Sequence, residues 1–298
     1  MWLRRHDSAF WGWSAQQVAF RLVEGRSPRS GSPNPASAVS ESIFEAVGND
    51  LYVATEAALG PWTDRALHGG PPTMLMAREV ERFQPDQNMF VTRLTVELLR
   101  PVGRTHLEVR CRLVRPGRKV QLVEASLWSH EKEVARATAL RIRRADVAVP
   151  ETTEPPPHLL PATLGVWTGS YRSGPAYHED GVEIRTARED RGELAPNWGW
   201  VRLKLPLVPG EEPSGLVRVC AAADFPNGIS YVVDPRKISY VNPDVTVYMH
   251  RLPLGEWVMV DARTWLQPRG SGFAEGALYD EEGRIGRSMQ GLLVEARS

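Results

Sequence analysis

The sequence lacks several features that mark particular classes of protein. Two cysteines, Cys111 and Cys220, are too few for the disulfide framework of a small secreted protein or for a zinc cluster. The seven histidines are not spaced in pairs as metal ligands are. We therefore expect no metal and no other cofactor.

Charge of one sign and long apolar runs are lacking too. The 36 basic residues balance the 36 acidic ones, which argues against nucleic acid or an anionic membrane as a partner. No apolar run approaches the ~20 residues that a membrane-spanning helix needs. Arg4 and Arg5 suggest an export signal, but Gln16 and Gln17 interrupt the segment and no small-residue cleavage site follows. We expect a cytoplasmic protein.

The sequence does contain an internal repeat. When it is shifted by 151 residues, residues 94–142 align with residues 245–293 without a gap. Identical pairs include Thr95 with Thr246 and Val109 with Val260, and the polar turns coincide as well. Apolar and polar residues alternate within each copy, which indicates half-buried strands. We expect three strands in each copy, joined by short turns into an antiparallel meander.

A helix is predicted before each copy. Residues 67–83 are rich in helix formers and carry two prolines that suit a first helical turn. Residues 214–224 begin with Ser214, a good N-cap, and are apolar on nearly all sides, so a sheet should enclose this helix. One helix and one antiparallel sheet, repeated, give an α+β architecture, a double hotdog in which two sheets join into one.

The composition also divides the chain. Residues 1–41 form a predicted disordered extension, rich in Ser, Pro and Gly toward its end. The two hotdogs are expected at residues 42–145 and 165–298, and the proline-rich residues 146–164 read as a linker.

Four motifs carry a family resemblance: HGGPPTMLMAREVER, RLTVELLRPV, AAADFPNGIS and LYDEEGRIGRSMQGLLVEAR. In this order they resemble the TesB-like acyl-CoA thioesterases, and more closely the actinobacterial type with two fused hotdogs. The resemblance covers the chain from about Phe44 to the C-terminus. It implies a protein that hydrolyses acyl-CoA, with acyl-CoA as its partner. It leaves open whether the protein forms homo-oligomers.

The resemblance also implies a catalytic trio of Asp, Thr or Ser, and Gln that holds the attacking water. The Asp corresponds to Asp224 and the Gln to Gln290, whereas the hydroxyl position is occupied by Asn242. An amide can hydrogen-bond a water but cannot act as a hydroxyl does. The departure at Asn242 therefore favours an alternative function, a double hotdog that binds acyl-CoA without hydrolysing it.

The repeat points to the same residues independently. Asn242 and Gln290 correspond to Val91 and Ala139 in the first copy, so one copy is polar where the other is apolar. Buried polar groups cost stability unless they are partnered, which indicates one working site. Asp224 ends a helix, where the dipole disfavours an anion. It either has a function or merely starts the turn that follows.

The motif at His68, Gly69 and Gly70 lies where the first helix begins. Backbone N–H groups there can bind a thioester carbonyl as charge develops on its oxygen. The alternative is an ordinary tight turn. We expect Trp62, Trp198 and Trp200 either to line an acyl pocket or to pack in a core.

Other activities find less support in the sequence. Cys220 reads as a core residue more than as a nucleophile, and no G-x-S-x-G motif occurs. The glycine-rich run GSGFAEG lacks dinucleotide-binding spacing. A hotdog hydratase would carry an Asp and His pair near a helix, and no such pair follows either predicted helix.

Overall fold

The computed structural model of the chain describes residues 40–61, 63–167, 175–187 and 197–297. Trp62 and nearly all of the predicted N-terminal extension lie outside these residues. The first half contains β1 (Phe44–Gly48), β2 (Leu51–Ala54), η2 (Glu56–Ala58), α1 (Gly70–Arg82), β3 (Met89–Glu97), β4 (His106–Arg115), β5 (Val120–Ser129) and β6 (Lys132–Arg143).

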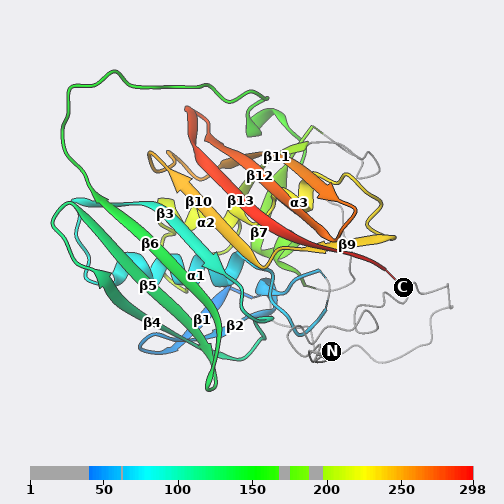
Figure 1. Ribbon diagram of the computed structural model, residues 1–298, viewed down its shortest axis with the longest axis horizontal. Coiled ribbons are helices and arrows are strands. Elements are labelled where there is room, and N and C mark those ends of the chain that lie inside the picture. The colour runs from blue at the N-terminus through cyan, green and yellow to red at the C-terminus, as the bar shows by residue number, and fades with distance from the viewer. Residues whose placement is uncertain (1–39, 62, 168–174, 188–196, 298) are drawn as a thin grey trace, which may run out of the picture.

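The second half repeats this order with a few additions. It contains η3 (Pro161–Thr163), η4 (Tyr177–Gly181), β7 (Val182–Arg185), β8 (Asn197–Leu203), α2 (Gly215–Ala223), α3 (Pro226–Ile229), β9 (Ile238–Val241), β10 (Asp244–Met249), β11 (Val258–Gln267), β12 (Ser271–Asp280) and β13 (Gly283–Ala296). Residues 144–160 join the halves without a helix or strand and run along one side of the molecule (Figure 1).

One antiparallel sheet runs through both halves in the described part of the chain. Its order is β1-β2-β4-β5-β6-β3-β10-β13-β12-β11-β8-β7, and β9 pairs with β13 beside β10 (Figure 1). The order reads the same from either end once each strand is replaced by its counterpart in the other half. The halves meet where β3 pairs with β10, so neither half leaves an open edge at the junction. The predicted double hotdog is confirmed.

The strand registers reproduce the internal repeat. Val109 pairs with Leu127 in the first half, and Val260 pairs with Leu278 in the second. A register shift follows both Leu127 and Leu278. At the junction Thr95 lies opposite Thr246, its own counterpart, so the two halves are related by a pseudo-two-fold axis through this pair.

The predicted three-strand meander is incomplete. β4, β5 and β6 form it in the first half, but a fourth strand, β3, pairs with β6 and not with its successor β4. Residues 98–105 separate β3 from β4, and a connection of that length does not force its two strands to pair. This arrangement places β3 at the centre of the molecule, where it can pair with β10.

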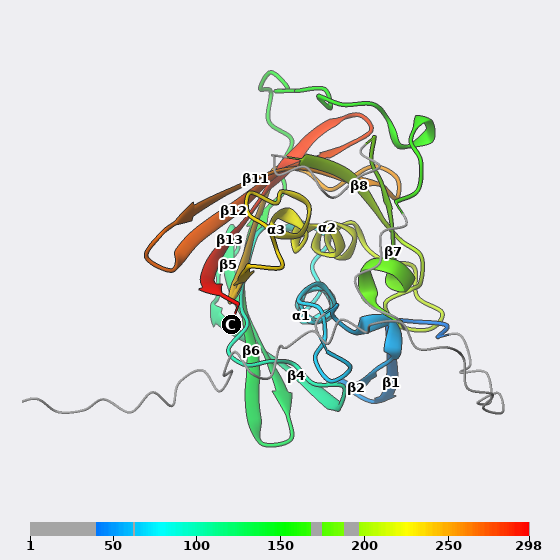
Figure 2. The same ribbon diagram turned by 90° about the vertical axis from the view of Figure 1, so that its right-hand side faces the viewer.

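The two helices lie side by side on the inner face of the curved sheet (Figure 2). Both begin close to their predicted positions, and Ser214 caps α2 by accepting a hydrogen bond from the Val217 N–H at 3.2 Å. The N-terminus of each helix meets the C-terminal end of the other: Ser214 bonds to Glu81 in α1, and Gly69 lies against Asp224, which follows α2. Two equivalent helix junctions result, one of which carries the predicted site.

Candidate active site

Asp224 is a buried carboxylate held by two side-chain amides. Its relative exposure is 3%, so an ionised carboxylate here needs partners. Asn242 donates from Nδ2 to Asp224 Oδ1 at 2.8 Å, and Gln290 donates from Nε2 to the same oxygen at 2.9 Å. The two amides of the predicted trio therefore both contact the carboxylate, although the three residues come from separate segments: after α2, between β9 and β10, and within β13.

Asn227, in the short helix α3, fixes the orientation of both amides. Its backbone N–H donates to Gln290 Oε1 at 3.2 Å, and its Nδ2 donates to Asn242 Oδ1 at 3.1 Å. Because each amide oxygen accepts from Asn227, each amide nitrogen is turned toward Asp224. Asn227 belongs to the motif AAADFPNGIS, but no role was predicted for it from the sequence. Its position three residues after Asp224 is the feature that could have suggested a role in the site.

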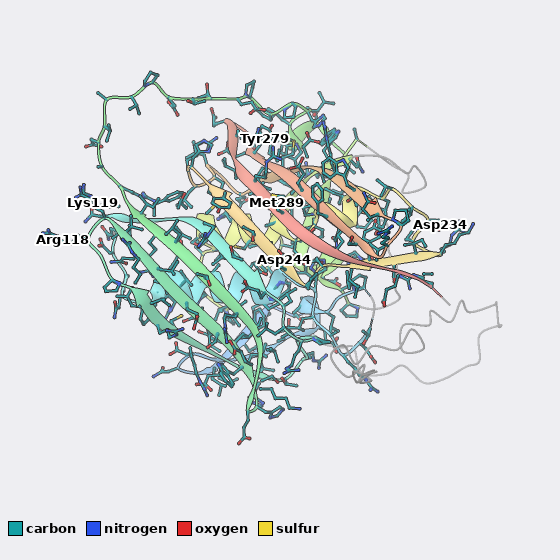
Figure 3. The ribbon with its side chains drawn as sticks, in the orientation of Figure 1. Arg118, Lys119, Asp234, Asp244, Tyr279 and Met289 are labelled. Atoms are coloured by element: carbon teal, nitrogen blue, oxygen red, sulfur yellow. The ribbon has the colours of Figure 1, made fainter. Side chains whose placement is uncertain are left out.

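Asn242 lies at a break in the strand. β9 ends at Val241 and β10 begins at Asp244, whereas the equivalent strand β3 runs on with a register shift between Val91 and Arg93. Breaks and bulges redirect side chains and occur near active sites. Asp244, labelled in Figure 3, accepts a hydrogen bond from the Gly291 N–H at 2.7 Å, which ties β10 to the strand segment carrying Gln290.

The start of α1 closes the other side of the carboxylate. His68 Nδ1 lies 2.9 Å from Asp224 Oδ2. A Cβ atom placed on Gly69 would come within 2.6 Å of the same oxygen, so only glycine allows this approach. The trio thus shares one site with the predicted binding residues His68, Gly69 and Gly70. Both halves of the chain contribute to this site.

This arrangement explains why an acidic residue can end a helix. The C-terminus of α2 disfavours the negative charge of Asp224, but the N-terminus of α1 carries a partial positive charge and faces that carboxylate. Two amides and a second helix therefore offset the unfavourable position. We predicted from the sequence that the start of the first helix would meet the second half at one site, but not that it would contact the carboxylate of Asp224.

The pseudo-equivalent junction in the first half lacks this chemistry. α1 is followed by Phe83 where α2 is followed by Asp224, and Val91 and Ala139 take the places of Asn242 and Gln290. Arg141, 3% exposed, instead donates from its guanidinium to the carbonyls of Phe83, at 2.7 Å, and Val80. The charge of Arg141 there satisfies the end of α1. Among the described residues, the trio is formed at one junction.

Two other residues considered in the sequence, Cys220 and Trp200, lie in packed surroundings that fit a role in the core. Cys220 is fully buried in α2, and burial raises its thiol pKa far above the ordinary value, which fits a core residue and not a nucleophile. Trp200 packs with Met259 and Tyr279 in a cluster separate from the main core, and its indole N–H donates to Leu159 in the connecting segment. These positions support the core interpretation of Trp200.

The described residues were also searched for metal-ligand clusters, membrane-spanning helices and cavities. Within the described ranges, no three His, Cys, Asp or Glu side chains converge as metal ligands, and no helix there is long and apolar enough to cross a membrane. A cavity of about 70 Å³ borders the site and is lined by Asn227, Tyr231, Tyr240 and Arg297, among others. A larger hollow of about 850 Å³ lies on the first half, beside Arg100 and His130, and includes none of the predicted site residues.

A hotdog hydratase is expected to carry an Asp and His pair on one shared loop near a helix, and neither predicted helix is followed by such a pair. The structure does bring an Asp and a His together, but from the ends of two different helices: His68 precedes α1 and Asp224 follows α2. The pair is distant in sequence, so no local spacing could reveal it.

Comparisons with known proteins agree with this fold. Residues 58–142 match the family model of the acyl-CoA thioesterase N-terminal domain, and residues 149–294 match that of the C-terminal domain. No curated protein is significantly similar to the chain in sequence.

Solved structures are similar over most of the chain. A hot dog fold protein of unknown function from Alicyclobacillus acidocaldarius has a TM-score of 0.67 at 16% identity, covering 88% of this chain and 99% of its own. An acyl-CoA thioesterase II from Mycobacterium marinum has a TM-score of 0.60 at 15% identity, covering 86% and 96%. A TesB protein from Mycobacterium avium has a TM-score of 0.61 at 14% identity, covering 85% of this chain and 95% of its own. At these identities the likeness shows the fold alone.

Proposed function

We propose, since the chain belongs to the acyl-CoA thioesterase family, that it hydrolyses fatty acyl-CoA to free acid and CoA with a water activated by Asp224. The observation that carries the proposal is the buried carboxylate of Asp224, held by Asn242 and Gln290 against the N-terminus of α1. A positioned base beside a cluster of N–H donors is what acyl transfer to water requires.

The reaction follows from this placement. The water oxygen attacks the thioester carbonyl carbon while Asp224 accepts a proton from that water as general base. The amide groups of Asn242 and Gln290 orient the water. The carbonyl oxygen becomes negatively charged, and the N–H groups at Gly69 and Gly70 stabilise it. The C–S bond then breaks, and the CoA thiolate takes the proton from Asp224.

Exposure indicates how substrate reaches the base. Asp224 and Gln290 are buried, whereas Gly69 and Asn242 are partly exposed. A thioester carbonyl can therefore approach past Gly69 and Asn242 while the base stays shielded. Shielding from bulk water strengthens the electrostatic interactions of the carboxylate with its donors.

Thiol release from a panel of acyl-CoAs tests the proposal. The purified protein should release thiol from at least one member of a panel that varies chain length and branching. Binding of these compounds without any thiol release would replace hydrolysis by the non-catalytic acyl-CoA-binding function. That alternative is favoured by one observation: the Asn242 amide donates directly to Asp224, where the resemblance implies a hydroxyl.

A matched pair of variants tests the asymmetry between the halves. Gln290→Ala should lower kcat roughly 10²-fold, because it removes an amide that orients the water and holds Asp224. Ala139→Gln, at the equivalent position of the first half, should leave kcat per folded molecule unchanged, although its thermal midpoint should fall because a polar side chain enters a buried position. Equal effects of the two changes on kcat would contradict the one-site scheme.

A further inference from the structure

The imidazole of His68 is held rigidly between the two halves. The ring lies 5.0 Å from the Tyr177 ring and 5.1 Å from the Phe225 ring, measured between centroids. The residue is 7% exposed. The Tyr177 and Phe225 rings lie 5.9 Å from each other, so they pack together against the imidazole. This packing and the burial of His68 restrict rotation of the ring, so the direction of its Nδ1 atom is a fixed feature of the site.

His68 Nδ1 lies close to one hydrogen-bond acceptor and one hydrogen-bond donor. Nδ1 lies 2.9 Å from Asp224 Oδ2 and 3.1 Å from the backbone nitrogen of Gly70. A ring nitrogen carries either a proton or a lone pair, so it cannot donate to the carboxylate and accept from the amide at once. With the proton on Nδ1, it donates to Asp224. Without that proton, it accepts from Gly70 and faces the carboxylate lone pair against lone pair.

The charge of Asp224 decides between the two states. Among the described residues, Tyr177 is a second titratable side chain that packs on the ring. Its pKa is raised well above its ordinary value by burial and then by Asp224, and its hydroxyl donates to the Ala221 carbonyl at 3.1 Å. Tyr177 is therefore neutral, and the ionised carboxylate draws the proton to Nδ1. His68 Nδ1 then no longer accepts from the Gly70 N–H, which is left for another acceptor.

We propose that His68 is a positioning residue of the hydrolysis, acting through Nδ1. Its N–H holds the second oxygen of Asp224, and the same protonation state releases the Gly70 N–H for the thioester carbonyl oxygen. The base and the oxyanion donor are thereby prepared together. The proton on Nδ1 stays in place during the reaction, since the proton of the water passes to Asp224 and on to the thiolate. The inference rests on the proposed function.

The first test reads the protonation state without needing activity. Nitrogen-15 NMR of the histidine rings should show the proton on Nδ1 of His68 in the unmodified protein, with the signal assigned by its loss in His68→Phe. Asp224→Asn should move the proton to Nε2, because a neutral amide no longer requires a donor. A proton on Nε2 in the unmodified protein would overturn the inference. If that protein hydrolyses no acyl-CoA, the proposed function fails while this measurement still gives its answer.

The second test reads catalysis. His68→Phe keeps an aromatic ring against Tyr177 and Phe225 but removes the nitrogen, so kcat should fall ~10²-fold with little change in KM. His68→Asn places an amide donor near the position of Nδ1 and should recover about tenfold of that loss. His106→Phe, the same change at an exposed site on β4, serves as the control and should leave kcat unchanged. A kcat of His68→Phe within about threefold of the unmodified protein would also overturn the inference.

Discussion

At the scale of the residue, the site depends on close approach between a carboxylate and a helix start. Gly69 has φ −66° and ψ −25°, a backbone conformation that alanine adopts without strain. The restriction at this position is therefore spatial: an added Cβ would lie 2.6 Å from Asp224 Oδ2. Asp224 cannot move aside easily, because Asn242 and Gln290 hold its other oxygen.

We expect Gly69→Ala to lower kcat at least ~10-fold, since displacement of Asp224 misplaces the attacking water. The free energy of unfolding should fall by about 1–3 kcal/mol from overpacking. Gly165→Ala, where an added Cβ meets no atom within 4 Å, is the control and should change neither quantity. Steady-state kinetics and chemical denaturation measure both, and an unaltered kcat in Gly69→Ala would show that the contact is unimportant.

Asn242→Thr tests the departure from the family pattern. Threonine restores the hydroxyl that the resemblance implies, but a hydroxyl has one proton. It cannot replace all three bonds of the amide, which donates to Asp224 and to the Asp244 carbonyl and accepts from Asn227 Nδ2. We expect kcat to be maintained or raised, because one donor toward Asp224 is retained. The thiol-release assay compares the two proteins. A loss of kcat as large as that of Gln290→Ala would show that this protein has come to depend on an amide at residue 242.

The sequence predicted the members of the trio and a site shared with Gly69 and Gly70, but not the contact between His68 and Asp224. The motif resemblance and the repeat both pointed to Asp224, Gln290 and Asn242, and the structure places them in contact. The contact of His68 with Asp224 was not predicted, because it joins residues from different halves and depends on how α1 and α2 pack. Sequence periodicity describes one element at a time and contains no such information.

At the scale of the element, the two helix junctions differ in how the C-terminal end of the helix is stabilised. The carbonyls at the end of a helix need donors, and Arg141 supplies them at the end of α1. Asp224 at the end of α2 instead makes a site that depends on the start of α1. The sequence predicted both long helices and three strands in each copy, because their patterns are local. It missed the pairing of β3 with β6 and β10, because pairing partners are set by packing of the whole sheet.

We expect Arg141→Met to destabilise the fold without affecting catalysis. The methionine fills similar space but leaves carbonyls of α1 without their donor, which should cost about 2–4 kcal/mol in the free energy of unfolding. The remaining folded protein should keep its kcat, since the proposed active site lies at the other junction. Arg143→Met, the same change on the exposed part of β6, should alter stability by less than about 0.5 kcal/mol. Equal midpoints for the two variants in urea would contradict the capping role.

At the scale of the whole molecule, two hotdogs in one chain give one site in the described residues. The single site uses α1 from the first half and Asp224, Asn242 and Gln290 from the second. Neither half contains it alone. Fusion into one chain allows the two junctions to diverge, because each half has its own sequence, whereas two identical subunits would carry the same residues at both.

The N-terminal extension stands apart from this architecture. Residues 1–39 lie outside the described part of the chain, and their composition together with their absence from the repeat predicts that the fold does not need them. Deletion of residues 1–39 should leave the thermal midpoint within about 2 °C of the full-length value. A large drop would show that the tryptophans at residues 2, 11 and 13 pack on the folded body.

The most direct test of the central claim is the rate of thiol release by Asp224→Asn, on an acyl-CoA that the unmodified protein hydrolyses. Asparagine keeps the shape of the side chain but cannot accept a proton from water. The account predicts a fall in kcat of ~10²–10⁴-fold, the usual contribution of a general base, with a folded protein by circular dichroism. Hydrolysis by Asp224→Asn at the rate of the unmodified protein would contradict the account, because another group would then have to activate the water.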